Sequence, residues 1–206
     1  MDQNYKYTSS QDSNNPEKPV LYINKQLIKF PGKYIRVFDS HMRLLTKAHS
    51  LPFKLREKLN IYSDENRTNC IATAETKKII DFNVAFVIRQ PEDGKPLGGI
   101  RRKGLTSELL RDAWLIYDGE GEEIAVLQEP NIHFSLIRRW ILPFIPQAYE
   151  MALKDGSASL LIKQTWTPVL LRYRVYSKNY QKFTKKIPQK LLATILCTVA
   201  AIEGDG

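Results

Sequence analysis

The twelve residues Leu191–Ile202 (LLATILCTVAAI) carry no charge, and they follow a chain whose middle consists of short β-hairpin patterns. On a helical wheel the large aliphatic side chains share one arc, while Ala, Thr and Cys fill the other. A surface helix carries charged residues on its solvent side, so this segment is predicted to be a helix that is buried all round. Pro188 suits the first helical turn and Gly204 a left-handed C-terminal cap, which places the helix at about residues 188–203.

Either a protein core or a membrane could enclose this helix. Twelve residues rise about 18 Å in an α-helix, whereas the hydrocarbon core of a bilayer is about 30 Å thick. The length therefore favours a core helix and no transmembrane segment. Full burial of its large aliphatic side chains is worth roughly 9–18 kcal/mol as an upper estimate, which is comparable to the net stability of a whole domain.

The 206 residues suffice for one domain with a full core. Residues 1–18 (MDQNYKYTSSQDSNNPEK) have almost no aliphatic content and are predicted to be a disordered polar leader. They lack the apolar stretch of a signal peptide, so export is not expected. The two cysteines, Cys70 and Cys197, do not make a disulfide framework, and a cytoplasmic location is therefore expected.

Short strand patterns separated by Asp/Gly turns recur through the middle of the chain. Tyr34–Phe38 leads through a turn at Asp39 into Leu44–Ala48, and Trp114–Tyr117 leads through Asp118 into Ile124–Leu127, so that the two hairpins align without a gap. Further strands are predicted at Gln26–Lys29, Leu59–Ser63, Cys70–Ala74, Phe86–Arg89, Leu97–Ile100, Tyr149–Leu153, Leu160–Lys163 and Leu170–Val175. A short helix is predicted at Phe134–Trp140.

Strands at this spacing predict a sandwich or a barrel. An antiparallel sheet long enough to close on itself, followed by one apolar helix, is arranged most simply as a barrel around that helix. The predicted fold is therefore mainly β (α+β): a closed antiparallel β-barrel of about twelve strands around a central hydrophobic C-terminal helix. Residues 19–206 would form this barrel as a single domain.

The chain resembles the tubby C-terminal-like superfamily, and within it the LURP-one-related and phospholipid-scramblase-like branch. The resemblance covers about Lys25 to Glu203 and includes the apolar terminal helix. Its other features are the turn of Trp114, Ile116 and Asp118, then Gly121, Ile124 and Glu129, the segment Leu136–Arg139, and the stretch Leu97–Arg102. These are hydrophobic patterns with a few turn residues, which are more specific for fold than for function.

The resemblance implies a twelve-stranded barrel around a central helix. It also implies binding of membrane phosphoinositides through basic surface residues, without known catalysis. Scramblase-like members are associated with calcium-dependent lipid movement. This chain has no cysteine cluster for palmitoylation, no proline-rich arm and no calcium loop that aligns, which argues against active lipid scrambling. The phosphoinositide-contacting positions of tubby do not match this sequence residue by residue, so none is transferred.

Charge is unevenly distributed along the chain. Between Gly156 and Ile202 there is no Asp or Glu, but there are eight basic residues: Lys163, Arg172, Arg174, Lys178, Lys182, Lys185, Lys186 and Lys190. The rest of the chain has 31 minus 8, or 23, basic residues against 22 acidic ones, so nearly all of the net charge of +9 comes from one segment. Such asymmetry is typical of an anionic partner, either phospholipid or nucleic acid, and a solvated basic surface is the alternative.

Three groups of basic residues are candidates for binding phospholipid head groups. They are Arg101, Arg102 and Lys103 after the glycine hairpin, Arg138 and Arg139 in the short helix, and Lys178, Lys182, Lys185 and Lys186 before the terminal helix. Arginine would bind phosphate as a bidentate fork and lysine as a point charge. Because successive side chains of a strand alternate, Arg101 and Arg102 are expected to point to opposite faces.

The sequence gives little support for a catalytic or metal-binding site. The three histidines, His41, His49 and His133, have no metal-ligand spacing, and no P-loop, dinucleotide fingerprint or nucleophile elbow is present. Neither a cofactor nor an enzymatic activity is therefore predicted. The acidic turn of Asp118, Glu120 and Glu122 is a weak calcium candidate, with a solvated hairpin tip as the alternative.

These observations predict non-enzymatic binding of anionic phospholipid or phosphoinositide head groups through a basic exterior patch. The protein would be cytoplasmic and peripheral to the inner face of the membrane. Nucleic-acid binding is the alternative, because the tail lysines are interleaved with tyrosines that could stack on bases. A structural or interaction scaffold without a small ligand is the further alternative.

Overall fold

The computed structural model describes residues 18–26, 33–50, 58–77, 85–103, 113–129, 148–166 and 170–202. These residues form twelve strands and two helices. The strands are β1 (Leu21–Gln26), β2 (Lys33–Asp39), β3 (Leu44–Ser50), β4 (Lys58–Tyr62), β5 (Cys70–Lys77), β6 (Ala85–Arg89), β7 (Pro96–Lys103), β8 (Ala113–Asp118), β9 (Glu123–Gln128), β10 (Ala148–Leu153), β11 (Ser159–Trp166) and β12 (Leu170–Tyr176). The helices are α2 (Tyr180–Lys186) and α3 (Gln189–Ile202).

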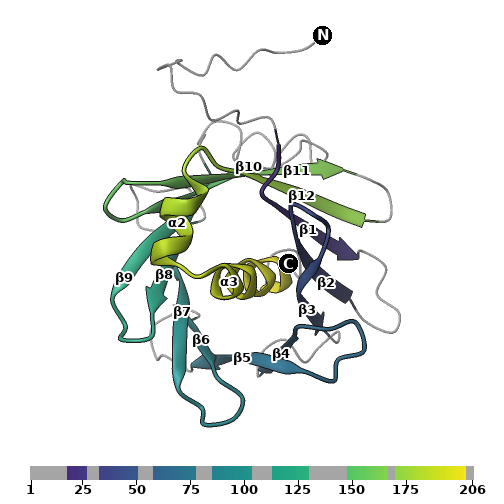
Figure 1. The fold of residues 1–206 in the computed structure, drawn as a ribbon. Coiled ribbons are helices and arrows are strands. Elements are labelled where there is room, and N and C mark those ends of the chain that lie inside the picture. The colour runs from purple at the N-terminus through teal and green to yellow at the C-terminus, as the bar shows by residue number, and fades with distance from the viewer. Residues whose placement is uncertain are drawn as a thin grey trace, which may run out of the picture.

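Each strand pairs antiparallel with its neighbour in the chain, and β1 pairs with β12 to close the barrel (Figure 1). Closure leaves no edge strand with unpaired backbone groups, which removes the usual route to edge-to-edge aggregation. Inward side chains are mostly aliphatic and alternate with outward ones along the strands, as at Ile35 and Val37 of β2. The predicted closed barrel of about twelve antiparallel strands is confirmed.

Helix α3 runs inside the barrel (Figure 1), and every residue from Leu192 to Ala201 is buried. Its small face approaches the backbone of β2 and β3: Thr46 Oγ1 donates to Ala193 O at 3.3 Å, and Cys197 Sγ lies 3.9 Å from Ile35 O. Thr198 satisfies its hydroxyl within the helix by donating to the carbonyl four residues earlier. The prediction of a helix buried all round is confirmed. Among the described residues, no helix is long and apolar enough to cross a bilayer.

Strand β1 corrects the sequence prediction, which began the first strand at Gln26 and therefore too late. The inward positions of β1 are Leu21, Ile23 and Lys25, and a lysine at an inward position hides the alternation. Lys25 is 1% exposed, and its Nζ donates to Ala200 O at 2.5 Å. A buried ammonium is tolerable there because a cation is favourable at the C-terminal end of a helix.

Helix α2 was not predicted, because its lysines resemble a solvated charge run. It lies at the mouth of the barrel (Figure 1), and both Phe183 and Ile187 are fully buried. Their spacing of four residues is the helical signal that the sequence did contain. The predicted helix Phe134–Trp140 lies outside the described residues, and so does the predicted leader apart from Lys18.

The barrel has two distinct ends. The turns β2–β3, β4–β5, β6–β7, β8–β9 and β10–β11 gather at one end, which we call the turn end, together with α2 and the start of α3. Helix α3 runs from there to the opposite end, which we call the far end, where Ala200 meets Lys25. Each surface residue can therefore be assigned to an end or to the outer wall between them.

Candidate anion-binding surface

Basic side chains line the outer wall of the barrel near the place where the last strand, β12, pairs with the first strand, β1. Lys163 on β11 is directly opposite Arg174 on β12, and Arg172 lies on the same face two residues earlier. Across β1, Arg172 is aligned through Asn24 with Arg36 on β2. Arg36 is in turn opposite Lys47 on β3. We call this set, Lys163, Arg172, Arg174, Arg36 and Lys47, the basic band.

At the β11–β12 end of the band, the part of the chain that the structure describes provides no ion-pair partner for the cations. Neighbouring strands lie about 4.8 Å apart, and like charges directly opposite each other destabilise a sheet. Among the described residues, no carboxylate forms an ion pair with Lys163, Arg172 or Arg174, all of which are exposed. The only described contact of these three cations with a ring is that of Lys163 Nζ, 5.7 Å from the centroid of Tyr176. This part of the outer wall therefore presents three exposed cations side by side.

The β2–β3 end of the band already holds an anion of the protein itself. Glu65, in the β4–β5 turn, accepts from Arg36 Nε at 3.0 and 3.2 Å and from Lys47 Nζ at 2.6 Å. Lys47 Nζ also donates to the backbone oxygen of Glu65 at 2.6 Å. The hydrogen bond from Lys47, supported by that from Arg36, holds the pKa of Glu65 below its usual range. Both cations also lie within 6 Å of the Tyr34 ring, at 5.5 and 5.1 Å.

The predicted group Arg101, Arg102 and Lys103 lies at the far end of β7, and all three side chains are exposed. Arg102 is 5.8 Å from the ring of the inward-facing Trp114, whereas Arg101 is 5.5 Å from the ring of Tyr117. The two arginines therefore face opposite sides of the strand, as predicted. At most two of the three residues can serve any one surface.

The predicted tail lysines lie at the turn end, so the structure separates them from the β7 group by the length of the barrel. Lys178, Lys182, Lys185 and Lys186 are all exposed around α2. The same end carries exposed acidic turns, and Lys186 Nζ lies 3.9 Å from Asp155 Oδ2. This end therefore presents both signs of charge. The third predicted pair, Arg138 and Arg139, lies outside the described residues.

The acidic turn proposed for calcium uses its principal carboxylate to hold its own backbone. Asp118 Oδ1 accepts from the N–H of Glu120 at 3.1 Å and of Glu122 at 2.8 Å. Within the described ranges, no group of three or more His, Cys, Asp or Glu side chains is placed to hold a metal ion. The arrangement seen is that of an Asx turn that closes a hairpin.

Sequence reasoning did not find the basic band as a unit. Lys163, Arg172 and Arg174 were recognised only as part of an acid-free segment, and Arg36 and Lys47 lie more than a hundred residues earlier. The alternation of β12 (LLRYRVY) does place Arg172 and Arg174 on one face, which is a usable signal. Closure of the barrel implies that β12 pairs with β1, but the register of that pairing, which aligns Arg172 with Arg36, has no such signal.

No protein-family model, curated protein or solved structure matches this chain. Its structure defines a closed antiparallel barrel with a helix in its core and a basic band on its outer wall.

Proposed function

We propose that this protein binds anionic phospholipid head groups at a membrane surface through the basic band, without catalysis. The observation that carries the proposal is the cross-strand pair Lys163 and Arg174, with Arg172 beside it, which no described carboxylate neutralises. Arginine binds a phosphate as a planar fork, and lysine adds a point charge, so the three side chains suit a phosphorylated head group.

The aromatic residues beside the band also support a membrane role. Tyr176 contacts Lys163, and Tyr22 is opposite Arg174 on β1 and half-buried. Tyrosine is favoured at the membrane–water interface because its ring is apolar and its hydroxyl is polar. Three basic residues near an anionic leaflet contribute about 3 kcal/mol, or on the order of a hundredfold in affinity, before screening by salt.

The resemblance to the tubby-like superfamily adds to the proposal, because it implies phosphoinositide binding by basic surface residues. We place the protein in the cytoplasm, where the inner leaflet supplies anionic lipid. The resemblance also leads us to expect a relationship to the scramblase-like branch, without a lipid-scrambling activity.

Liposome co-sedimentation tests this proposal directly. We expect binding to phosphatidylcholine vesicles only when phosphatidylserine or a phosphoinositide is included, with binding falling as salt is raised. The double variant Arg172→Glu/Arg174→Glu should lose at least tenfold in partitioning. Lys182→Glu/Lys185→Glu at the turn end is the matched control, because it changes the net charge equally and should lose much less. Equal losses in the two variants would show that net charge, and not the band, determines binding.

Nucleic-acid binding is the competing outcome of the same charge distribution. A mobility-shift titration with single-stranded DNA at increasing salt distinguishes it, because phosphate contacts give a steep salt slope. We expect DNA binding to be weak and to lack preference among sequences. Tighter binding to DNA than to anionic vesicles at the same salt concentration would replace the lipid proposal.

A further inference from the structure

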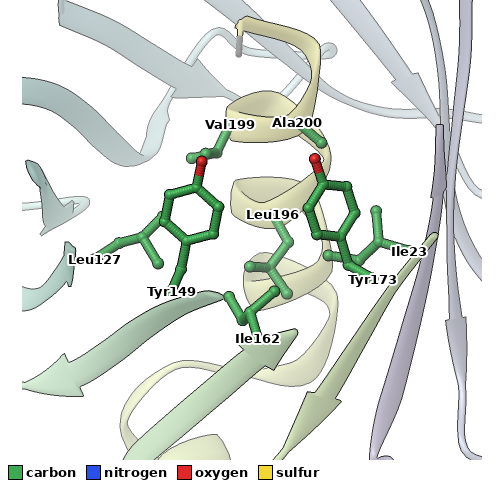
Figure 2. A pocket seen from close by; sticks show the side chains of 8 residues that line it. All are labelled: Ile23, Leu127, Tyr149, Ile162, Tyr173, Leu196, Val199 and Ala200. Carbon is green, nitrogen blue, oxygen red and sulfur yellow. The ribbon is translucent and has the colours of Figure 1, made fainter. Parts of the chain in front are cut away.

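The hollow beside α3 is too small to hold an organic ligand. Figure 2 shows it between the rings of Tyr149 and Tyr173, with Leu196 of α3 behind them. Its volume is about 30 Å³, which is room for one or two water molecules. A large partner would therefore meet this part of the barrel at its outer wall.

A second pair of exposed cations lies on the outer wall, on β7. Arg101 and Lys103 are two residues apart on this strand, so their side chains point to the same face of the sheet. The preceding residue, Ile100, is 1% exposed and points into the barrel, which places both cations on the outer face. Within the described part of the chain, no carboxylate forms an ion pair with either of them. We call this pair the β7 patch.

The β7 patch has the same composition as the β11–β12 end of the basic band. Arg101 lies 5.5 Å from the centroid of the Tyr117 ring, and Lys163 of the band lies 5.7 Å from that of Tyr176. Both tyrosines are half-buried, and each lies on the strand next to its cation. Each surface therefore combines exposed cations two residues apart on one strand with an amphipathic ring that suits a membrane interface.

The two surfaces face opposite directions. The basic band extends over β11, β12, β2 and β3, with β1 in the middle of it. In the closed barrel of twelve strands, β7 is the sixth strand from β1 in either direction. Figure 1 accordingly shows β1 and β7 on opposite sides of α3. One flat membrane cannot contact both surfaces at once.

The wall between the two surfaces carries no free positive charge that would join them among its described side chains. On one side, β8, β9 and β10 contain no lysine or arginine. On the other side, Glu75 pairs with Lys58 Nζ at 3.2 Å and with Arg89 Nε at 4.0 Å. The unneutralised cations of the described wall are therefore divided into two opposed patches and do not form a continuous ring.

We propose that the β7 patch binds a second anionic membrane surface, so that one protein molecule bridges two membranes. This inference rests on the proposed function of the basic band and adds a second site to it. Two basic residues near an anionic leaflet raise the affinity roughly thirtyfold before screening by salt, so the β7 patch is the weaker of the two sites. Many copies bound to one vesicle through the band would act together to capture a second vesicle.

A vesicle-clustering assay tests the bridge. Phosphatidylcholine vesicles that contain phosphatidylserine are prepared with a donor or an acceptor dye and mixed with the full chain. Energy transfer and light scattering report clustering, and co-sedimentation of the same samples reports binding. We expect the wild type to cluster the vesicles. Arg101→Glu/Lys103→Glu should need at least tenfold more protein to cluster them, while it keeps most of its partitioning through the band.

Lys182→Glu/Lys185→Glu is the matched control, because it changes the net charge equally at the turn end, and it should still cluster vesicles. Sedimentation velocity of each variant shows whether a dimer, which could bridge through two bands, is present. Binding without clustering by the wild type, or undiminished clustering by Arg101→Glu/Lys103→Glu, would overturn the bridge and leave the proposed function intact. Absence of wild-type binding would refute both. Capture of labelled single-stranded DNA by vesicle-bound protein, without capture of a second vesicle, would assign the β7 patch to nucleic acid and overturn the bridge.

Discussion

The hairpins β2–β3 and β8–β9 have the same turn conformation, but the residues around the turn differ. In both, the first strand shifts register near its end, and an aspartate then closes the turn. Asp39 Oδ1 accepts the N–H of His41 at 2.8 Å and of Arg43 at 2.9 Å. Asp118 Oδ1 accepts the corresponding groups two and four residues later, at 3.1 and 2.8 Å. The residue three positions after each aspartate has a positive φ.

The two hairpins differ in what surrounds that shared turn. Asp39 is 4% exposed, and its second carboxylate oxygen also binds Arg43 Nε at 2.7 Å, whereas Asp118 is half-buried within an acidic tip. Outward on β2 and β3 lie Arg36 and Lys47 of the basic band. The outward positions of β8 and β9 carry no basic residue. The turn aspartates are therefore structural, and the outward alternating residues decide what each hairpin can bind.

Removal of the turn carboxylates gives the largest expected difference between the hairpins. Asp39→Ala should lower the free energy of unfolding by about 3 kcal/mol, because it removes a buried carboxylate that accepts two backbone N–H groups and a charged contact from Arg43. Asp118→Ala should cost about 1 kcal/mol, because water can replace the carboxylate there. Urea denaturation of both variants measures the difference. Equal losses of stability would show that the burial of Asp39 does not increase the contribution of its carboxylate to the free energy of unfolding.

Substitutions at the two turn positions with positive φ should change the melting temperature in opposite directions. Met42 has φ 60° and is 54% exposed, and Gly121 has φ 90° with no heavy atom within 4 Å of the position that a Cβ would occupy. Left-handed backbone costs a residue with a side chain about 1–2 kcal/mol, so Met42→Gly should raise the melting temperature and Gly121→Met should lower it. The exchange should not alter vesicle binding, because neither residue belongs to the basic band. A lower melting temperature for Met42→Gly would mean that the Met42 side chain makes a stabilising contact.

The sequence predicts these hairpins well because their signals are local. A turn that begins with an aspartate, between strands of alternating pattern, is recognisable without knowledge of the rest of the fold. Strand β1 was misplaced because Lys25 occupies an inward position, where the C-terminal end of α3 makes a lysine acceptable. Similarly, Arg172 and Arg36 come together only because β12 pairs with β1, and that pairing is set by barrel closure. Local structure was predictable, whereas the candidate site depends on contacts between distant parts of the chain.

Low pH should reduce the stability of the protein through protonation of Asp39 in the β2–β3 hairpin. Burial alone would raise the pKa of this carboxyl, but the hydrogen bonds from Arg43 and His41 outweigh it and lower the pKa. A lowered folded pKa contributes stability that is present above the unfolded value of about 3.9 and is lost as the pH falls through the folded value. Wild type should therefore lose stability relative to Asp39→Asn below about pH 4, while the difference between them stays constant above about pH 5. Urea midpoints from pH 2 to 7 measure this, and parallel curves throughout would show that the pKa of Asp39 is unshifted.

The smallest expected effect comes from replacing Glu65, whose carboxylate pairs with Arg36 and Lys47 at the β2–β3 end of the basic band. Glu65→Gln should release part of the positive charge of Arg36 and Lys47 to the membrane and raise partitioning onto anionic vesicles about threefold, since each basic residue near the surface contributes about 1 kcal/mol and Lys47 is mostly buried. Lys47 keeps its bond to the backbone oxygen of residue 65, so the fold should tolerate the change. Glu122→Gln in the β8–β9 turn removes the same charge away from the band and is the matched control. A gain confined to Glu65→Gln, and absent on neutral vesicles, would extend the proposed lipid-binding surface from β11–β12 to β3. Equal gains in both variants would instead show that net charge, and not the position of Glu65 beside the band, determines partitioning.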